Sequence, residues 1–269
     1  MKVSIIVTNY KTPEVLKLCL ASLCSQKVPF SFEVLVTDVE AVFEDRQMIE
    51  DVFPGVRYIP IADNCGFARA VNRGLKEAHG EYIVVVNSDI VFSDDTSLAR
   101  LIEYIEAHRE VGICAPALLN FDGTPQQSYF RFYTPLAIAA RRTALGSFSF
   151  AQKALDSFLM RDLVPTGISQ EPLKVDWLMG AALVFQKDFF KKIGGLDEQF
   201  FMYFEDVDIA RRAHDAGMTV MYYPLVKAFH YHQKASASKR GVLDILLKKY
   251  TRIHIASAIK YYLKHGFSR

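Results

Sequence analysis

The sequence predicts an α/β fold in which helices cover both faces of a mostly parallel sheet. Three observations support this prediction. Short apolar runs alternate with segments of helical periodicity through about the first 115 residues. One run, Ile83 to Val86, is apolar throughout, as expected for a strand buried on both faces. Several runs end in polar side chains, at the point where sheets of this class hold their ligands.

The predicted elements follow one another along the first part of the chain. A helix is expected after Thr12, a candidate N-cap that precedes Pro13. The other predicted helices cover residues 67–78 and 98–105, and strands are expected at residues 3–7, 34–36, 56–59, 83–86 and 111–115.

The alternation is lost after Pro116. Residues 129–174 mix aromatic residues, arginines, glycines and prolines without a clear period. No elements are predicted there, and an inserted subdomain over the crevice is one interpretation. Around and beyond this region we expect a turn at residues 121–124, a strand at 175–185, a short helix that stops at Gly194, a helix that runs from residue 209 to Gly217, and a strand at 219–223.

The composition is that of a globular protein with a substantial core, with 269 residues, 51% of them hydrophobic and 23% charged. The formal net charge is +2, but it is unevenly distributed. Residues 234–269 hold nine Lys or Arg and one acid, so residues 1–233 are mildly acidic. We expect no nucleic-acid partner, and the sequence does not indicate an oligomeric state.

The cysteines and the hydropathy pattern indicate a compartment. The four cysteines, Cys19, Cys24, Cys65 and Cys114, form no C-x-x-C pair and lie in apolar or strand-like stretches, so we expect free, buried thiols in a reducing environment. No signal peptide is apparent, and no apolar run reaches the ~20 residues that span a bilayer. We therefore expect a cytoplasmic protein, either in solution or peripheral on the inner membrane.

Polar side chains end three of the predicted strands. They are Thr8, Asn9 and Tyr10 after the first, Asp38 after the second, and Asn87, Ser88 and Asp89 after the central one. Carboxylate and amide oxygens beside a sheet crevice suit a divalent cation and the phosphates that it carries. The alternative is that such residues bond their own backbone at turns.

A second group of acids begins a predicted helix. Glu205, Asp206 and Asp208 follow a run of aromatic and sulfur-bearing residues. Burial raises a carboxylate pKa and the helix N-terminus favours the ionised form, so this position suits a general base. The alternative is that Asp206 is a helix cap.

Two histidines, His230 and His232, lie on one face of an extended stretch. An imidazole there would complete an oxygen-rich site for Mn²⁺ or contact a phosphate, and a plain surface strand is the alternative. The motifs of zinc proteases, α/β-hydrolases, P-loop NTPases and dinucleotide enzymes are all missing from the sequence, which argues against those classes.

The basic tail has one apolar helical face, formed by Val242, Leu246, Tyr250, Ile253 and Ala256, with Lys248, Lys249 and Arg252 elsewhere on the surface. A basic amphipathic helix is typical of binding to an anionic membrane. Docking of the same apolar face on the protein core is the alternative.

Taken together, these motifs resemble the family 2 glycosyltransferases of the GT-A fold, and within them the rhamnosyltransferase-like branch. The similarity is carried, in chain order, by Val3 to Tyr10, Asn64 to Ala68 with Asn72 and Gly74, Asn87 to Asp89, Gly194 to Glu198 with Phe201 to Asp208, and Pro224 with His230. The resemblance implies a Rossmann-like GT-A domain over residues 1–233. Residues 1–116 would be the nucleotide-sugar half, 117–233 the acceptor and base half, and 234–269 a helical tail.

The resemblance also implies roles. Asp206 would be the base, beside Glu205, and Asp89 and His230 would bind Mg²⁺ or Mn²⁺. Asp38 would accept from the imide of a uracil or thymine ring. The other donor-binding residues would be Thr8, Asn9, Tyr10, Asn64, Gly66, Arg69, Asn72, Asn87 and Ser88. Two departures are Asn87, where the family has an acid, and Val39, where it has Asn.

The activity implied by the resemblance is transfer of a sugar from a nucleotide diphosphate donor, with inversion, onto a surface glycan. The first choice of donor is dTDP-rhamnose, and the acceptor is expected on a polyprenyl diphosphate lipid. Three alternatives stay open. They are a hexosyl or galactofuranosyl transferase that uses a UDP-sugar, a nucleotidyltransferase, and a non-catalytic subunit that binds a nucleotide-sugar.

Overall fold

The computed structural model describes residues 1–142, 144–164, 169–231 and 249–266. The strands are β1 (Val3–Asn9), β2 (Phe32–Val39), β3 (Arg57–Ile61), β4 (Tyr82–Asn87), β5 (Ile90–Phe92), β6 (Val111–Leu119), β7 (Tyr129–Phe130), β8 (Leu173–Val175), β9 (Trp177–Leu178), β10 (Ala182–Gln186) and β11 (Thr219–His230). The helices are α1 (Pro13–Cys24), α2 (Phe43–Val52), α3 (Phe67–Glu77), α4 (Ser97–Ala107), α5 (Pro135–Arg142), the 3₁₀ helix η1 (Ala144–Ser147), α6 (Ser149–Phe158), α7 (Lys187–Lys192), α8 (Glu205–Asp215) and α10 (Lys249–His265).

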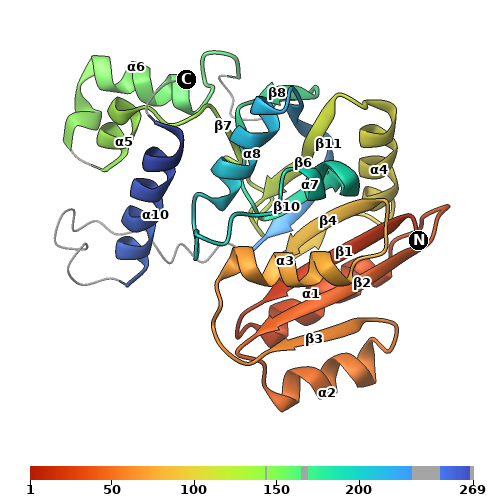
Figure 1. Ribbon diagram of the computed structural model, residues 1–269. Helices are drawn as coiled ribbons and strands as arrows, with labels where there is room; N and C mark the ends of the chain where they lie inside the picture. The colour runs from red at the N-terminus through yellow and green to blue at the C-terminus, as the bar shows by residue number, and fades with distance from the viewer. Residues whose placement is uncertain (143, 165–168, 232–248, 267–269) are drawn as a thin grey trace.

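One large sheet organises the molecule, in the order β3-β2-β1-β4-β10-β6-β11-β5, with β8 added beside β11 (Figure 1). Strands β3, β2, β1 and β4 are parallel, and so are β6 and β11. Strand β10 runs antiparallel between β4 and β6. The predicted α/β fold with a mostly parallel sheet is therefore confirmed.

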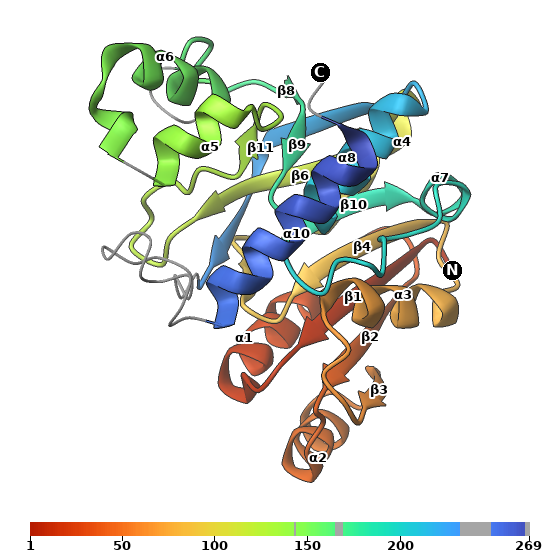
Figure 2. The same cartoon turned by 60° about the vertical axis from the view of Figure 1, so that its left-hand side comes forward.

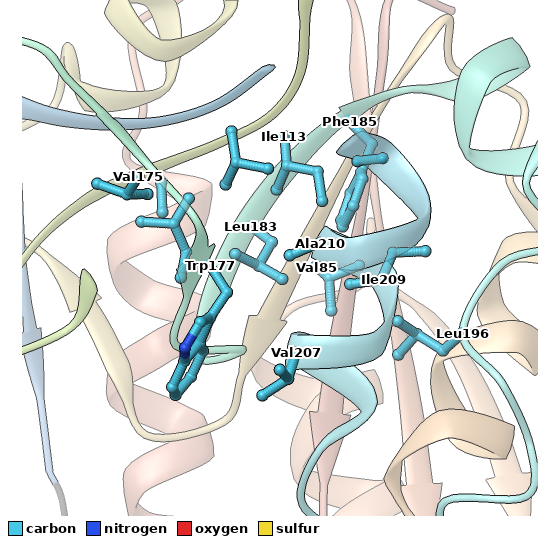
Figure 3. Close-up of a cluster of buried hydrophobic side chains, with 14 of the residues drawn as sticks. Val85, Ile113, Val175, Trp177, Leu183, Phe185, Leu196, Val207, Ile209 and Ala210 are labelled. Atoms are coloured by element: carbon cyan, nitrogen blue, oxygen red, sulfur yellow. The ribbon is translucent and has the colours of Figure 1, made fainter. Parts of the chain in front are cut away.

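The central strand β4 is buried on both faces, as its apolar sequence predicted. Ile83 and Val85 pack toward α3 and α8, whereas Val84 and Val86 pack toward α1 and α4. On the first face, Val207, Ile209 and Ala210 of α8 lie against strand side chains that include Leu183 and Phe185 (Figure 3). This packing fixes the helix that carries the predicted base against the middle of the sheet.

Several predicted boundaries were wrong. The single strand expected at residues 175–185 is three short strands, because the chain leaves the ladder at Asp176 and again from Met179 to Ala181, and each piece pairs with a different strand. Strand β11 continues past Pro224 to His230, with an irregularity in its pairing between Tyr223 and Lys227 that accommodates the proline. Helix α2 was not predicted, because only Asp45 and Ile49 of its ten residues are buried and its apolar period is weak.

The region without predicted structure contains α5, η1, α6 and the strand pair β7–β9. Phe130, Tyr133, Phe158 and Trp177 stack on one another there, with ring centroids 4.3 to 6.4 Å apart. This aromatic packing joins the inserted helices to the strand pair, and Tyr133 also contacts Phe204 just before α8.

The C-terminal helix α10 docks on the body through Ser257 and Tyr261, which are both buried. The predicted apolar face was therefore partly wrong, since Ala256 is exposed, while Val242 and Leu246 lie outside the described residues. All four cysteines are free, but Cys24 is exposed rather than buried. None of the helices in the described ranges combines the length and apolar character of a membrane span.

Candidate active site

The polar ends of three neighbouring strands meet, because the parallel register aligns them. Thr8 lies opposite Asn87 on one side, and Asn9 lies opposite Asp38 on the other. The turn that follows β4 is fixed by one bond to the end of β1 and one to the residue that precedes α1. The Ser88 nitrogen donates to the Thr8 carbonyl at 3.0 Å, and the Ser88 hydroxyl lies 2.9 Å from that of Thr12.

Asp89 meets His230 across the pairing of β5 with β11, in which His230 lies opposite Ile90. The Nε2 of His230 is 3.5 Å from Oδ2 of Asp89. The structure thus brings together the two residues predicted to bind a metal, from positions 141 residues apart in the printed sequence. His232, the other predicted histidine, lies outside the described residues.

Gln126 determines which nitrogen of His230 carries a proton. The Gln126 amide nitrogen donates to the carbonyl of His230 at 2.9 Å and to Oδ1 of Asn120 at 2.7 Å. Its Oε1 therefore faces Nδ1 of His230, at 2.8 Å, and can only accept. In neutral His230 the proton is on Nδ1, so the lone pair on Nε2 points toward Asp89.

Asp206 is joined to this turn through the backbone that leads into β10. The nitrogen of Gly180 donates to Oδ2 of Asp206 at 3.1 Å, and the carbonyl of the next residue, Ala181, accepts from the nitrogen of Asn87 at 2.9 Å. The dipeptide Gly180-Ala181 thus connects the predicted base to the predicted metal turn through one hydrogen bond on each side. The Oδ1 of Asp206 accepts from the nitrogen of Val207 at 2.9 Å, within its own helix.

Burial raises the pKa of both acids at the start of α8. Burial raises the pKa of Asp206 to about 6, against the effect of the bonds from Gly180 and Val207. Burial, together with the charge of Asp206, raises the pKa of Glu205 well above its ordinary value. Oε2 of Glu205 is buried without a hydrogen-bond partner, which fits a protonated acid.

The backbone before α8 is strained. Tyr203 and Phe204 both have φ of 68°, in the left-handed region that side chains other than glycine seldom adopt. Ser257 of α10 donates to the carbonyl of Met202 at 2.8 Å and so supports this segment. Such strain persists where the surroundings hold it, and it is common at functional sites.

Two of the predicted donor residues, Asn9 and Asp38, form a buried hydrogen bond at 2.8 Å. The second oxygen of Asp38 accepts from the hydroxyl of Tyr58 at 2.6 Å. Burial raises the pKa of Asp38, while these two bonds oppose the rise. Tyr10, by contrast, is exposed, beside Lys11.

The predicted donor residues around α3 lie against the segment that leads to α8. Asn72 exchanges two hydrogen bonds with the backbone of Leu196, at 2.8 and 3.0 Å. Arg69 lies 3.6 Å from Glu198 in an exposed ion pair. The structure therefore places these side chains between α3 and the segment that leads to α8, and their contact with a donor stays a prediction.

Gly66 belongs to the same junction. A Cβ at this position would lie 2.3 Å from the carbonyl oxygen of Phe201, and φ of Gly66 is 83°. The backbone nitrogen of Gly66 also donates a hydrogen bond to Oδ1 of Asn64 at 3.2 Å. A packing requirement of the chain itself thus explains this glycine.

A family model, described as glycosyl transferase family 2, matches residues 4–170. The chain belongs to glycosyltransferase family 2. A second model, described as the N-terminal domain of galactosyltransferase, matches residues 169–235. An N-acetylglucosaminyl-diphospho-decaprenol L-rhamnosyltransferase of Mycobacterium tuberculosis is 28% identical over 238 residues, or 84% of this chain and 75% of that protein. The rhamnosyltransferase WbbL of Escherichia coli is 24% identical over 194 residues, or 71% and 65% of the two chains.

Solved structures show the same fold. GalNAc-T7 with UDP, GalNAc and Mn²⁺ gives a TM-score of 0.65 at 14% identity, covering 88% of this chain and 46% of the other. The mannosyltransferase PcManGT of Pyrobaculum calidifontis, with GDP-Man and Mn²⁺, gives a TM-score of 0.59 at 17% identity. The match covers 96% of this chain and 64% of that one. The GT-A fold implied by the sequence is confirmed, while this chain spans about half of the GalNAc-T7 chain.

A divalent cation fits the turn of this family 2 glycosyltransferase. Oδ1 of Asn87 and Oδ1 of Asp89 are buried without hydrogen-bond partners, and both are oxygen ligands. In the described part of the chain, no three His, Cys, Asp or Glu side chains gather in a metal-binding arrangement. A cation at this turn would therefore take further ligands from a bound substrate or water.

Sequence reasoning missed three residues of the site, namely Gly180, Gln126 and Tyr58. Gly180 had a usable signal, because a glycine inside an apolar strand-like run often marks a close backbone approach. No sequence signal marks Gln126 or Tyr58, because their roles depend on distant contacts. Gln126 contacts His230, 104 residues away, and Tyr58 contacts Asp38, 20 residues away.

Proposed function

We propose that this protein is an inverting, metal-dependent glycosyltransferase that uses a nucleotide diphosphate sugar as donor, with dTDP-rhamnose as the first choice. The acceptor is a hydroxyl of a growing surface glycan carried on a polyprenyl diphosphate lipid. The connection of Asp206 to the Asn87 turn through Gly180 and Ala181 carries this proposal. The similarity to rhamnosyltransferases supports the choice of sugar.

The reaction is a single displacement. The acceptor hydroxyl oxygen attacks the anomeric carbon, and the bond from that carbon to the diphosphate oxygen breaks on the opposite side. Asp206 takes the hydroxyl proton as the new bond forms, and the nucleoside diphosphate leaves with the electron pair. A pKa of about 6 suits this task, because the carboxylate is ionised at neutral pH yet is more basic than an exposed Asp.

The leaving diphosphate is assigned to the turn that holds Asn87, Asp89 and His230. Mg²⁺ or Mn²⁺ bound there supplies positive charge that stabilises the departing diphosphate. Asn87 contributes an oxygen without charge, so Asp89 is the charged ligand of this turn. The hydrogen bond from Nδ1 to Gln126 orients the His230 ring toward Asp89.

The nucleotide is assigned to the ends of β1 and β2. Asp38 is proposed to accept from the imide nitrogen of the base, and Thr8, Asn9 and Tyr10 to line the pocket. Asn9 and Tyr58 hold the Asp38 carboxylate in place and leave a lone pair on Oδ1 for the base.

The test is a turnover assay on the full chain. The protein is incubated with Mg²⁺ or Mn²⁺, a panel of dTDP- and UDP-sugars, and a polyprenyl-diphosphate-linked N-acetylglucosamine. We expect acceptor-dependent release of nucleoside diphosphate, with loss of release in Asp206→Asn and Asp89→Ala. Unchanged release in both variants would overturn the assigned roles.

The products separate the alternatives. Turnover of a UDP-sugar alone would favour the hexosyl or galactofuranosyl reaction. Pyrophosphate as the product would indicate a nucleotidyltransferase. Donor binding without turnover in the presence of the acceptor would indicate a non-catalytic subunit.

A further inference from the structure

The two faces of helix α10 differ in chemistry. The inward face includes Ser257 and Tyr261, which are buried. On the outward face Ile255, Ile259 and Leu263 are 36%, 55% and 83% exposed. These three residues recur every four positions, so they form one continuous apolar stripe along the helix.

The charges of α10 are all of one sign. Lys249, Arg252 and Lys260 are exposed, and the helix sequence contains no Asp or Glu. Lys264 is turned inward, where its Nζ lies 2.6 Å from both Asp197 and Asp208. The solvent-facing side of α10 therefore combines large aliphatic residues with exposed cations, and the helix itself contributes no acid.

The inward face holds the segment that leads to the proposed base. His265 lies 2.7 Å from Asp208, and Lys260 donates to the carbonyl of Gln199 at 2.7 Å. Near the other end of the helix, the pKa of Glu40 is lowered, mainly by the hydrogen bond from Lys11. The charge of Lys249 adds to this effect. The C-terminal end of helix α10 thus lies beside α8, as Figure 2 shows.

We propose that the outward face of α10 docks on an anionic lipid bilayer and lies in the plane of its interface. The stripe of Ile255, Ile259 and Leu263 enters the acyl boundary, and Lys249 and Arg252 meet anionic headgroups. Because the inward face is bonded to residues 197–208, the bilayer fixes the position of the base-bearing segment. A second copy of the chain fits this face less well, since a symmetric contact would oppose cations with cations.

This inference is independent of the proposed reaction, because lipid binding is measured without donor or acceptor. The full chain is sedimented with vesicles of phosphatidylcholine, or of equal parts phosphatidylcholine and phosphatidylglycerol. We expect binding to the anionic vesicles only, falling as salt is added. Equal binding to both kinds, or binding to neither, would overturn the proposal.

The apolar stripe is tested by the triple variant Ile255→Ser/Ile259→Ser/Leu263→Ser. We expect its partition coefficient to fall at least about tenfold, since burial of these side chains drives interfacial binding. The matched control is Leu18→Ser/Val42→Ser/Phe43→Ser, which removes three exposed apolar side chains from α1 and the start of α2. Wild-type binding in the triple variant, or an equal loss in the control, would contradict the assignment.

The cations are tested separately. Lys249→Gln/Arg252→Gln should lower binding by about tenfold at low salt and much less at high salt. Lys17→Gln/Lys76→Gln, which removes two exposed cations from α1 and α3, should bind as the wild type does. Sedimentation velocity gives the remaining outcome. If the wild type is a dimer that the triple variant converts to monomers, this face is an interface between copies and the proposal is wrong.

Discussion

The backbone nitrogen of Gly180 donates to Oδ2 of Asp206 at 3.1 Å, and no side chain at position 180 intervenes. A Cβ there would lie 3.2 Å from Cβ of Asp206, closer than most such contacts. The bond both orients the carboxylate and favours its ionised form. Gly180 is therefore part of the arrangement that positions the proposed base.

Gly180→Ala should displace Asp206 and lower kcat by about tenfold to a hundredfold, because small misplacements of a catalytic group have large effects on rate. Donor KM should stay near its wild-type value, since the proposed nucleotide pocket is at the ends of β1 and β2. Gly55→Ala is the control, because a Cβ at Gly55 meets nothing within 4 Å. A wild-type kcat in Gly180→Ala would show that the base tolerates this displacement.

The pH dependence follows from the pKa of Asp206, which is raised from 3.8 to about 6. The base must be ionised, so kcat/KM should rise with pH through about 6 and then level off. The contribution of Asp206 to the stability of the fold changes with pH in the opposite direction. A raised carboxyl pKa stabilises the folded state at low pH, and that contribution is lost as pH rises through 6.

Asp206→Asn should therefore abolish turnover but raise Tm at pH 7, where the wild type holds a partly buried charge. The gain should disappear near pH 4, because Asp206 is then protonated in the folded state and the ionised form no longer destabilises it. Thermal unfolding of both proteins across this range is the measurement. An equal Tm at pH 7 would contradict the raised pKa.

Glu205 should behave differently from Asp206. Its pKa is raised well above the ordinary value by burial and by the charge of Asp206, and both effects favour its neutral form. Glu205→Gln preserves the shape of the neutral acid and should keep kcat within about threefold of wild type, because no charge is lost. A loss as large as that of Asp206→Asn would mean that ionised Glu205 takes part in the reaction.

Much of this site was predictable because it depends on strand ends. A buried strand followed by polar residues predicts which side chains reach the crevice, and the structure joined Asp89 with His230 as expected. The local sequence does not encode which other groups those side chains contact. Gln126 reaches His230 through a turn and a long strand, and the sequence shows no periodicity linking them.

The basic tail illustrates the other limit. Its composition predicted an amphipathic helix, but the pattern alone left open whether the predicted apolar face binds a membrane or docks on the core. The choice is made by partners distant in sequence, since Asp208 accepts from His265 and Met202 accepts from Ser257. With these contacts on the inward face, Ile259 is left exposed.

Gln126 is predicted to act on the metal through His230. Gln126→Leu removes the acceptor that fixes the Nδ1 proton, and should weaken Mn²⁺ binding by about tenfold or more. Gln126→Glu keeps an acceptor at Nδ1 and should restore part of the affinity. Free Mn²⁺, followed by electron paramagnetic resonance with a nucleoside diphosphate present, gives the affinity without turnover. Equal affinity in all three proteins would remove Gln126 from the site.

Asn72 provides a test that separates structural support from donor binding. Its amide exchanges two hydrogen bonds with Leu196, and both residues are buried. Asn72→Ala leaves the Leu196 backbone groups without these partners, so the free energy of unfolding should fall by about 2 kcal/mol. Urea unfolding measures this loss. Gln47→Ala, which removes an exposed amide on α2, should change the free energy of unfolding little.

If the Asn72→Ala variant instead keeps its stability and binds the nucleotide sugar more weakly by calorimetry, Asn72 contacts the donor directly. Because the bonds join α3 to the segment before α8, a stability loss with unchanged donor affinity would show that Asn72 holds the two halves of the site together.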